Sequence, residues 1–67
     1  MNVIPRYMKE YAGAQRKSYI NNKLIQEKYK NGAVEVIDRT LRSVEHGLIT
    51  INEGMKILCD PLDGIIL

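Results

Sequence analysis

The sequence contains one cysteine, one histidine, and neither tryptophan nor phenylalanine. One cysteine cannot form an internal disulfide, and one cysteine with one histidine is too few for a structural zinc site. A chain of 67 residues also has no room for a nucleotide-binding domain or a barrel. A domain of this size buries only about 60% of the surface that its unfolded chain exposes. We therefore expect helix packing, self-association or a partner protein to supply the stability that so small a core lacks.

Long apolar runs are absent as well. No stretch reaches the roughly 18 apolar residues that a membrane-spanning helix needs. Arg6, Lys9 and Glu10 interrupt the N-terminal segment, which therefore lacks the apolar core of a secretory signal. The sequence predicts a cytoplasmic protein without membrane contact, in which Cys59 stays reduced.

The first segment has the spacing of an amphipathic helix. Pro5 suits a first helical position because its missing N–H is not needed there. Residues at intervals of three and four then form an apolar stripe: Ile4, Tyr7, Met8, Tyr11, Ala12 and Ala14. After Ser18 the apolar positions change phase and continue as Tyr19, Ile20, Leu24, Ile25 and Tyr29. We predict a basic helix over residues 5–30 that Asn31-Gly32 stops. This helix either kinks near residues 13–18 or turns a different face to its neighbours after that point.

Two shorter helices are expected after this stop, over residues 33–46 and 50–59. Gly47 is suited to the left-handed cap between them. Thr50 and Glu53 have the spacing of a capping box at the start of the last helix, which Asp60-Pro61 ends. We expect the two helices to form a hairpin that packs against one face of the first helix: Tyr19, Ile20, Leu24 and Ile25.

The predicted fold class is therefore all-α: one small domain of two to three helices over residues 1–67, with a C-terminal helical hairpin. Residues 60–67 form an apolar tail that covers the core or contacts another chain.

In the second helix, Glu35–Arg39 and Asp38–Arg42 have the spacing of ion pairs on one helix face.

An unbroken heptad pattern supports an alternative. Apolar residues recur at intervals of three and four through Val34, Ile37, Leu41, Val44, Leu48, Ile51, Met55, Leu58, Leu62 and Ile65. A single continuous helix with this pattern would form a coiled-coil oligomer. Gly47, Gly54 and the capping box favour a break instead, in which case the same residues mark the core face of both helices.

Residues that could carry chemistry are few and isolated. Glu45 adjoins His46 in sequence but would point to another face of a helix, so we expect His46 to interact with a helix C-terminus rather than to act in catalysis. Cys59 beside Asp60 lacks the positive surroundings of a reactive thiolate, and we expect it at the edge of the core. Asp60 and Asp63 flank a turn but lack the further oxygen ligands of a calcium loop. The sequence predicts no enzyme activity, no catalytic residues, no cofactor and no metal site.

Charge is divided unevenly between the two parts of the chain. Residues 1–30 carry seven basic and two acidic side chains, and residues 31–67 carry three basic and six acidic ones. We therefore expect the positive part to meet a partner with an acidic surface, unless the two parts attract each other. The candidates for partner binding are Arg6, Tyr7, Lys9, Tyr11, Arg16, Lys17, Lys23, Leu62, Ile65 and Ile66.

These observations favour a small non-enzymatic protein-binding module that acts as an inhibitor, adaptor or regulatory subunit of a larger protein. One alternative is a nucleic-acid-binding protein, since basic residues alternate with tyrosines in the first segment. The helical hairpin could also act as a helix-turn-helix that presents Asn52, Glu53 and Lys56 to DNA, although its second helix carries little positive charge. A third possibility is a homo-oligomeric helical module built on the heptad pattern.

Overall fold

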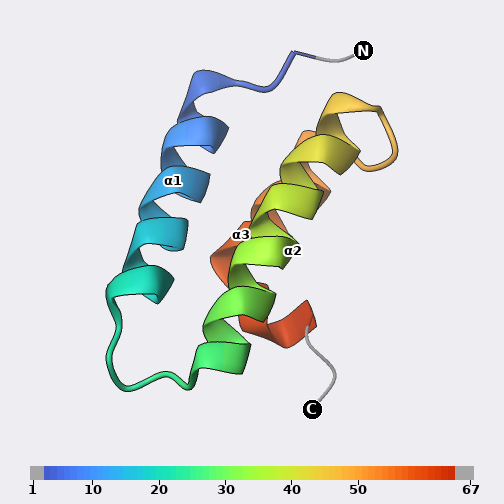
Figure 1. Cartoon of the computed structure of the whole chain (residues 1–67). Helices are drawn as coiled ribbons and strands as arrows, with labels where there is room; N and C mark the ends of the chain where they lie inside the picture. The colour runs from blue at the N-terminus through green and yellow to red at the C-terminus, as the bar shows by residue number, and fades with distance from the viewer. Residues whose placement is uncertain (1–2, 65–67) are drawn as a thin grey trace.

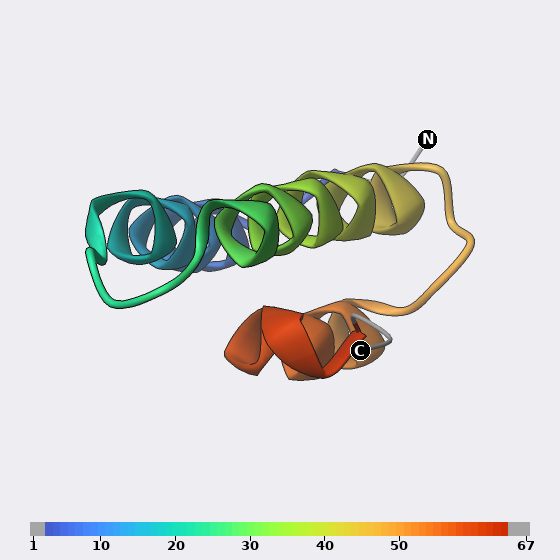
Figure 2. The same cartoon turned by 60° about the horizontal axis from the view of Figure 1, so that its bottom comes forward.

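The computed structural model describes residues 3–64, with side chains over residues 3–62, and all regular structure within this range is helical. The elements are α1 (Arg6–Asn21), α2 (Glu27–Glu45), α3 (Ile51–Cys59) and a short 3₁₀ helix, η1 (Pro61–Gly64). Helices α1 and α2 lie side by side and antiparallel (Figure 1). Helix α3 packs across one face of this pair, and η1 packs against α2 and α3 (Figure 2). The predicted all-α class with a C-terminal helical hairpin is confirmed.

The first helix is much shorter than the predicted range of residues 5–30. Pro5 precedes α1 as its N-cap, and its carbonyl accepts hydrogen bonds from the backbone of Met8 and Lys9. At the other end, the Asn22 side chain accepts a hydrogen bond of 2.9 Å from the backbone N–H of Leu24. An asparagine that bonds the backbone two residues onward forms a local turn that competes with the helix. The phase change after Ser18 therefore marks the approach to a helix end rather than a kink.

The second helix begins before the predicted stop and runs through it. Its N-cap is Gln26, which makes no side-chain capping bond, so the usual sequence signal of a helix start is missing. Asn31-Gly32 lies inside α2, where a glycine costs about 1 kcal/mol relative to alanine. Ala33 and Ile37 are fully buried just beyond it. Their burial outweighs the local preference of Asn31-Gly32 for a turn.

The connection between α2 and α3 follows the predicted capping chemistry. Gly47 adopts a left-handed conformation with φ 75°, and His46 is the C-cap of α2. The Glu53 backbone N–H donates to the Thr50 hydroxyl at 3.1 Å, and the Glu53 carboxylate accepts from the Thr50 backbone N–H at 3.2 Å. The Glu53 carboxylate also accepts a hydrogen bond from the Thr50 hydroxyl at 3.0 Å. The two bonds that this carboxylate accepts lower the pKa of Glu53, the one from the Thr50 backbone N–H most. The continuous heptad helix is therefore wrong: the chain turns here, and Leu48 is 76% exposed.

The core forms where the three helices meet. Its buried members are Met8 and Ala12 from α1, Ile37 and Val44 from α2, and Leu58 from α3. Half-buried apolar residues pack around it: Ile4, Tyr11, Tyr19, Leu41, Ile49, Ile51 and Met55. Of the four residues predicted to join the first helix to the hairpin, only Tyr19 packs against this cluster, and burial raises its pKa. Ile20 and Leu24 are exposed.

Polar contacts connect the same three helices. Gln15 Nε2 in α1 donates to the Leu58 carbonyl at 2.9 Å, and so satisfies a backbone acceptor at the end of α3. Arg16 Nη1 lies 3.4 Å from Asp38 Oδ1 in α2. The predicted Glu35–Arg39 ion pair is present at 2.6 Å. The predicted Asp38–Arg42 pair is not, because Asp38 bonds across to α1 instead.

No helix within residues 3–64 combines the length and the hydrophobicity that crossing a lipid bilayer requires.

Candidate functional site

The partner-binding candidates of the sequence lie on three different elements. Those on α1 extend from its first residue to Lys17, and the others are in the following turn and in η1: Arg6, Tyr7, Lys9, Tyr11, Arg16 and Lys17 on the helix, then Lys23 and Leu62. Ile65 and Ile66 lie outside the described residues. Because a helix rises about 1.5 Å per residue, the candidates on α1 alone extend over roughly 16 Å.

Several of these side chains are already engaged within the chain. Arg6 Nε lies 3.0 Å from Glu10 Oε1, and Arg16 contacts Asp38 as described. Tyr11 is half-buried against the core, and the neighbouring Cys59 side chain raises its pKa. Among the described residues, these contacts leave Lys9, Lys17 and Lys23 as the exposed candidates with a charge but no ion pair.

The residues considered for chemistry remain separate in space. His46 is exposed at the C-terminal end of α2. Cys59 is exposed at the end of α3, beside Tyr11, which packs against the core. Asp60 is exposed and caps α3. Over residues 3–64, no group of three or more His, Cys, Asp or Glu side chains comes close enough to hold a metal ion.

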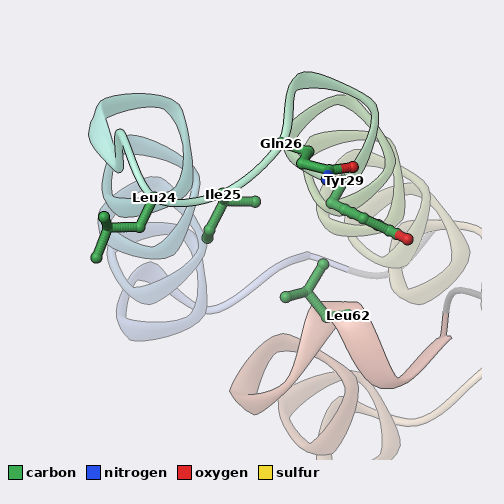
Figure 3. A pocket seen from close by; sticks show the side chains of 5 residues that line it. All are labelled: Leu24, Ile25, Gln26, Tyr29 and Leu62. Carbon is green, nitrogen blue, oxygen red and sulfur yellow. The ribbon is translucent and has the colours of Figure 1, made fainter.

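An apolar groove lies at the end of the molecule where α1 turns into α2. Its lining residues are Leu24, Ile25, Gln26, Tyr29 and Leu62, and its volume is about 390 Å³. In Figure 3, Ile25 lies between Leu24 and Tyr29, and Leu62 points from η1 towards Ile25. We call these five residues the turn groove. Leu24, at its outer edge, is 95% exposed, and Ile20 in the last turn of α1 is 51% exposed.

The two sides of the turn groove differ in charge. On the side formed by the turn and the start of α2, Lys23, Lys28 and Lys30 outnumber Glu27. Lys28 Nζ lies 4.9 Å from the centroid of the Tyr29 ring, so this cation stands beside a groove-lining residue. None of the three lysines forms an ion pair with another described residue. On the η1 side, the nearest described charge along the chain is Asp60, two residues before Leu62.

A second, smaller hollow lies between α2 and α3. It measures about 250 Å³ and has a mixed lining: Val36, Arg39, Thr40, Ser43, Ile49 and Ile57. Thr40 already donates to the Val36 carbonyl at 2.7 Å, and Arg39 pairs with Glu35. Its polar lining is therefore largely occupied by contacts within the chain.

Sequence reasoning found only Leu62 among the lining residues of the turn groove. Leu24 and Ile25 were expected to pack against the hairpin, and Tyr29 was placed in the same predicted helix. The signal that could have located the groove is the Asn21-Asn22 pair, since asparagine favours local turns. A turn at this point removes the following apolar residues from any regular helix face.

Comparison of the chain with protein-family models, with curated proteins and with solved structures gave no match.

Proposed function

We propose that this chain is a small protein-binding module that regulates a larger protein, as an inhibitor, adaptor or regulatory subunit. The observation that carries this proposal is the apolar surface at the α1–α2 turn. Leu24 is almost completely exposed next to an apolar groove, and Ile20 is half exposed one turn earlier. Single exposed apolar residues are common, but an apolar patch beside a hollow is typical of an interaction site.

Nucleic-acid binding is less well supported by the placement of the tyrosines. Bases stack on exposed aromatic faces. Tyr11 and Tyr19 pack against the core instead, and Lys28 lies over the ring of Tyr29. Tyr7 is exposed beside Arg6 and Lys9, but Arg6 is paired with Glu10. Tyr7 is thus the one tyrosine of the four that is exposed, which supports stacking on a row of bases less well than the alternation in sequence suggested.

The helix-turn-helix and the homo-oligomer lose their main support for similar reasons. A reading helix at α3 would have to offer Glu53 to DNA, yet Glu53 is engaged by Thr50 in the capping box. The heptad pattern that suggested an oligomer supplies Ile37, Val44 and Leu58 to the core of the chain itself. These residues are not free to form a seam between copies.

The proposal is tested by co-purification of tagged protein from cells of its source, with the variant Leu24→Asp. We expect a stoichiometric partner that survives nuclease treatment and is lost with Leu24→Asp. Leu48→Asp is the matched control, because Leu48 is also an exposed leucine in a turn, at the other end of α2. A partner that both variants retain would place binding elsewhere, and one that nuclease removes would favour nucleic-acid binding.

A further inference from the structure

We propose that the turn groove binds a linear segment of another protein. A large apolar side chain of that segment inserts into the hollow as an anchor, and acidic residues on one side of this anchor face Lys23 and Lys28. This inference rests on the proposed function and specifies the chemistry of its partner.

The size of the groove favours a linear segment over a broad surface. A standard interface between folded proteins involves about 20–30 residues on each side. The turn groove has five lining residues and a volume of about 390 Å³. Leu24, at its edge, is 95% exposed, and Ile20, four residues earlier in the chain, is 51% exposed. Such a site suits a few apolar side chains of one extended segment, in the way that peptide-binding domains take anchor residues.

The lining favours an apolar anchor. The side chains of Leu24, Ile25 and Leu62 are hydrocarbon, and Gln26 and Tyr29 are the lining residues with polar side-chain atoms. Small-molecule sites normally combine an apolar wall with several convergent polar groups that orient the ligand. Specificity in the turn groove must therefore come from charges at its edge.

The charges at the edge of the turn groove favour a segment with acidic residues on one side of its apolar anchor, which we call its acidic flank. The side of the groove at residues 23–30 carries Lys23, Lys28 and Lys30 against Glu27. Its lysines form no ion pair with any described residue. On the opposite side, Asp60 precedes Leu62 and would repel a second acidic flank. Charge complementarity sets orientation and association rate, so the segment is expected to bind in one direction.

The experiment is a selection from a displayed library of random dodecapeptides on the immobilised protein, with counter-selection on the Leu24→Asp variant. The expected product is a set of peptides that depend on Leu24 and share a large apolar residue with Asp or Glu on one side. Leu24-dependent peptides without acidic residues would refute this inference and leave the proposed function standing. Absence of any Leu24-dependent peptide would refute the linear segment, whereas the proposed function fails only if co-purification also finds no Leu24-dependent partner.

A charge reversal tests the direction of the flank. In Lys23→Glu/Lys28→Glu, we expect affinity for the selected acidic peptides to fall about tenfold, equivalent to roughly 1.4 kcal/mol. Selection on this variant should yield basic flanks in place of acidic ones. Lys56→Glu, an exposed lysine on α3, is the matched control and should leave affinity unchanged. Equal losses in the double variant and the control would refute a specific contact with the flank.

We expect all of these variants to fold like the wild type, because each substituted side chain is exposed. Leu24 is 95% exposed, and the hydrogen bond at its position involves its backbone N–H rather than its side chain. Lys23, Lys28 and Lys56 are exposed. Thermal unfolding followed by circular dichroism should therefore give similar midpoints for wild type and variants, so that lost binding reports on the groove itself.

Discussion

Replacement of Gly54 by alanine tests how closely α3 packs on the other helices. An added methyl group at this position would lie 2.6 Å from Met8 Cε and 2.8 Å from Val44 Cγ2. Carbon atoms in favourable contact are about 3.5–4.0 Å apart. Both neighbours are fully buried, so a structure that accommodates the methyl group must shift.

The magnitude follows from two opposing effects. Alanine is favoured over glycine inside a helix by about 1 kcal/mol. Overpacking of a core typically costs about 1–3 kcal/mol. Met8 can move its flexible end, but Val44 is β-branched and stiff, so α3 has to move away from α2. We expect Gly54→Ala to lower the free energy of unfolding by about 1 kcal/mol, or roughly 4–8 °C in the melting midpoint.

Gly13→Ala in α1 is the matched control. A methyl group at Gly13 would have no neighbour within 4 Å, and its backbone is ordinary helix. This substitution should therefore raise the free energy of unfolding by about 0.4–1 kcal/mol. The two alanine variants are expected to shift stability in opposite directions, as measured by urea unfolding followed by circular dichroism.

A double-mutant cycle identifies the contact responsible. In a Val44→Ala background the close approach to Val44 is removed, so Gly54→Ala should cost less than in the wild type. The two substitutions should thus show a coupling energy of at least about 0.5 kcal/mol. If Gly54→Ala stabilises the protein as much as Gly13→Ala does, the close packing of α3 against Met8 and Val44 is incorrect.

Three further predictions concern polar contacts. Thr50→Ala should cost about 0.5–2 kcal/mol in urea unfolding through loss of the α3 cap, and an NMR titration should show the pKa of Glu53 rising back towards its ordinary value. Because folding lowers the pKa of Glu53, the contribution of this carboxylate to stability is present above its unfolded-state pKa and is lost as pH falls through its folded-state pKa. If Thr50→Ala left the acid dependence of stability unchanged, this link between the cap and the pKa would be contradicted. A double-mutant cycle between Arg16 and Asp38 should give a coupling of about 0.2–1 kcal/mol that decreases with added salt, and zero coupling at low salt would mean the pair does not form in solution. Burial raises the pKa of Tyr19, so its hydroxyl should ionise at higher pH in the folded than in the unfolded protein. Stability should therefore fall as pH rises from the unfolded-state pKa through the folded-state pKa. Identical NMR titrations of Tyr19 in the two states would contradict its burial.

The predictable parts of the fold depend on local interactions. Thr50 and Glu53 are three residues apart, and their capping bonds need no other part of the chain. Gly47 ends α2 because glycine readily adopts positive φ. The spacing of Ile37, Val44 and Leu58 also correctly marked the core face of the hairpin.

The errors concern places where tertiary packing opposed a local preference or where a weak signal was overlooked. Asn31-Gly32 favours a turn, yet it continues as helix because burial of Ala33 and Ile37 stabilises α2. Gln26 is a poor capping residue, so the start of α2 carried little signal. Asn22 carried a usable signal that was outweighed by the apolar pattern around it. The turn groove was missed as a direct result.

The sequence by itself determined an all-α chain, the break at Gly47 and the capped start of α3, because each depends on residues within one or two turns of each other. Only the tertiary structure decided which apolar residues are buried. Leu58 is fully buried and Leu24 is almost fully exposed, although both are leucines in apolar segments. Leu58 lies in a helix that packs against residues distant in sequence, and it shares a core cluster with Met8 and Val44. Leu24 lies in the turn between α1 and α2, where no such packing covers it.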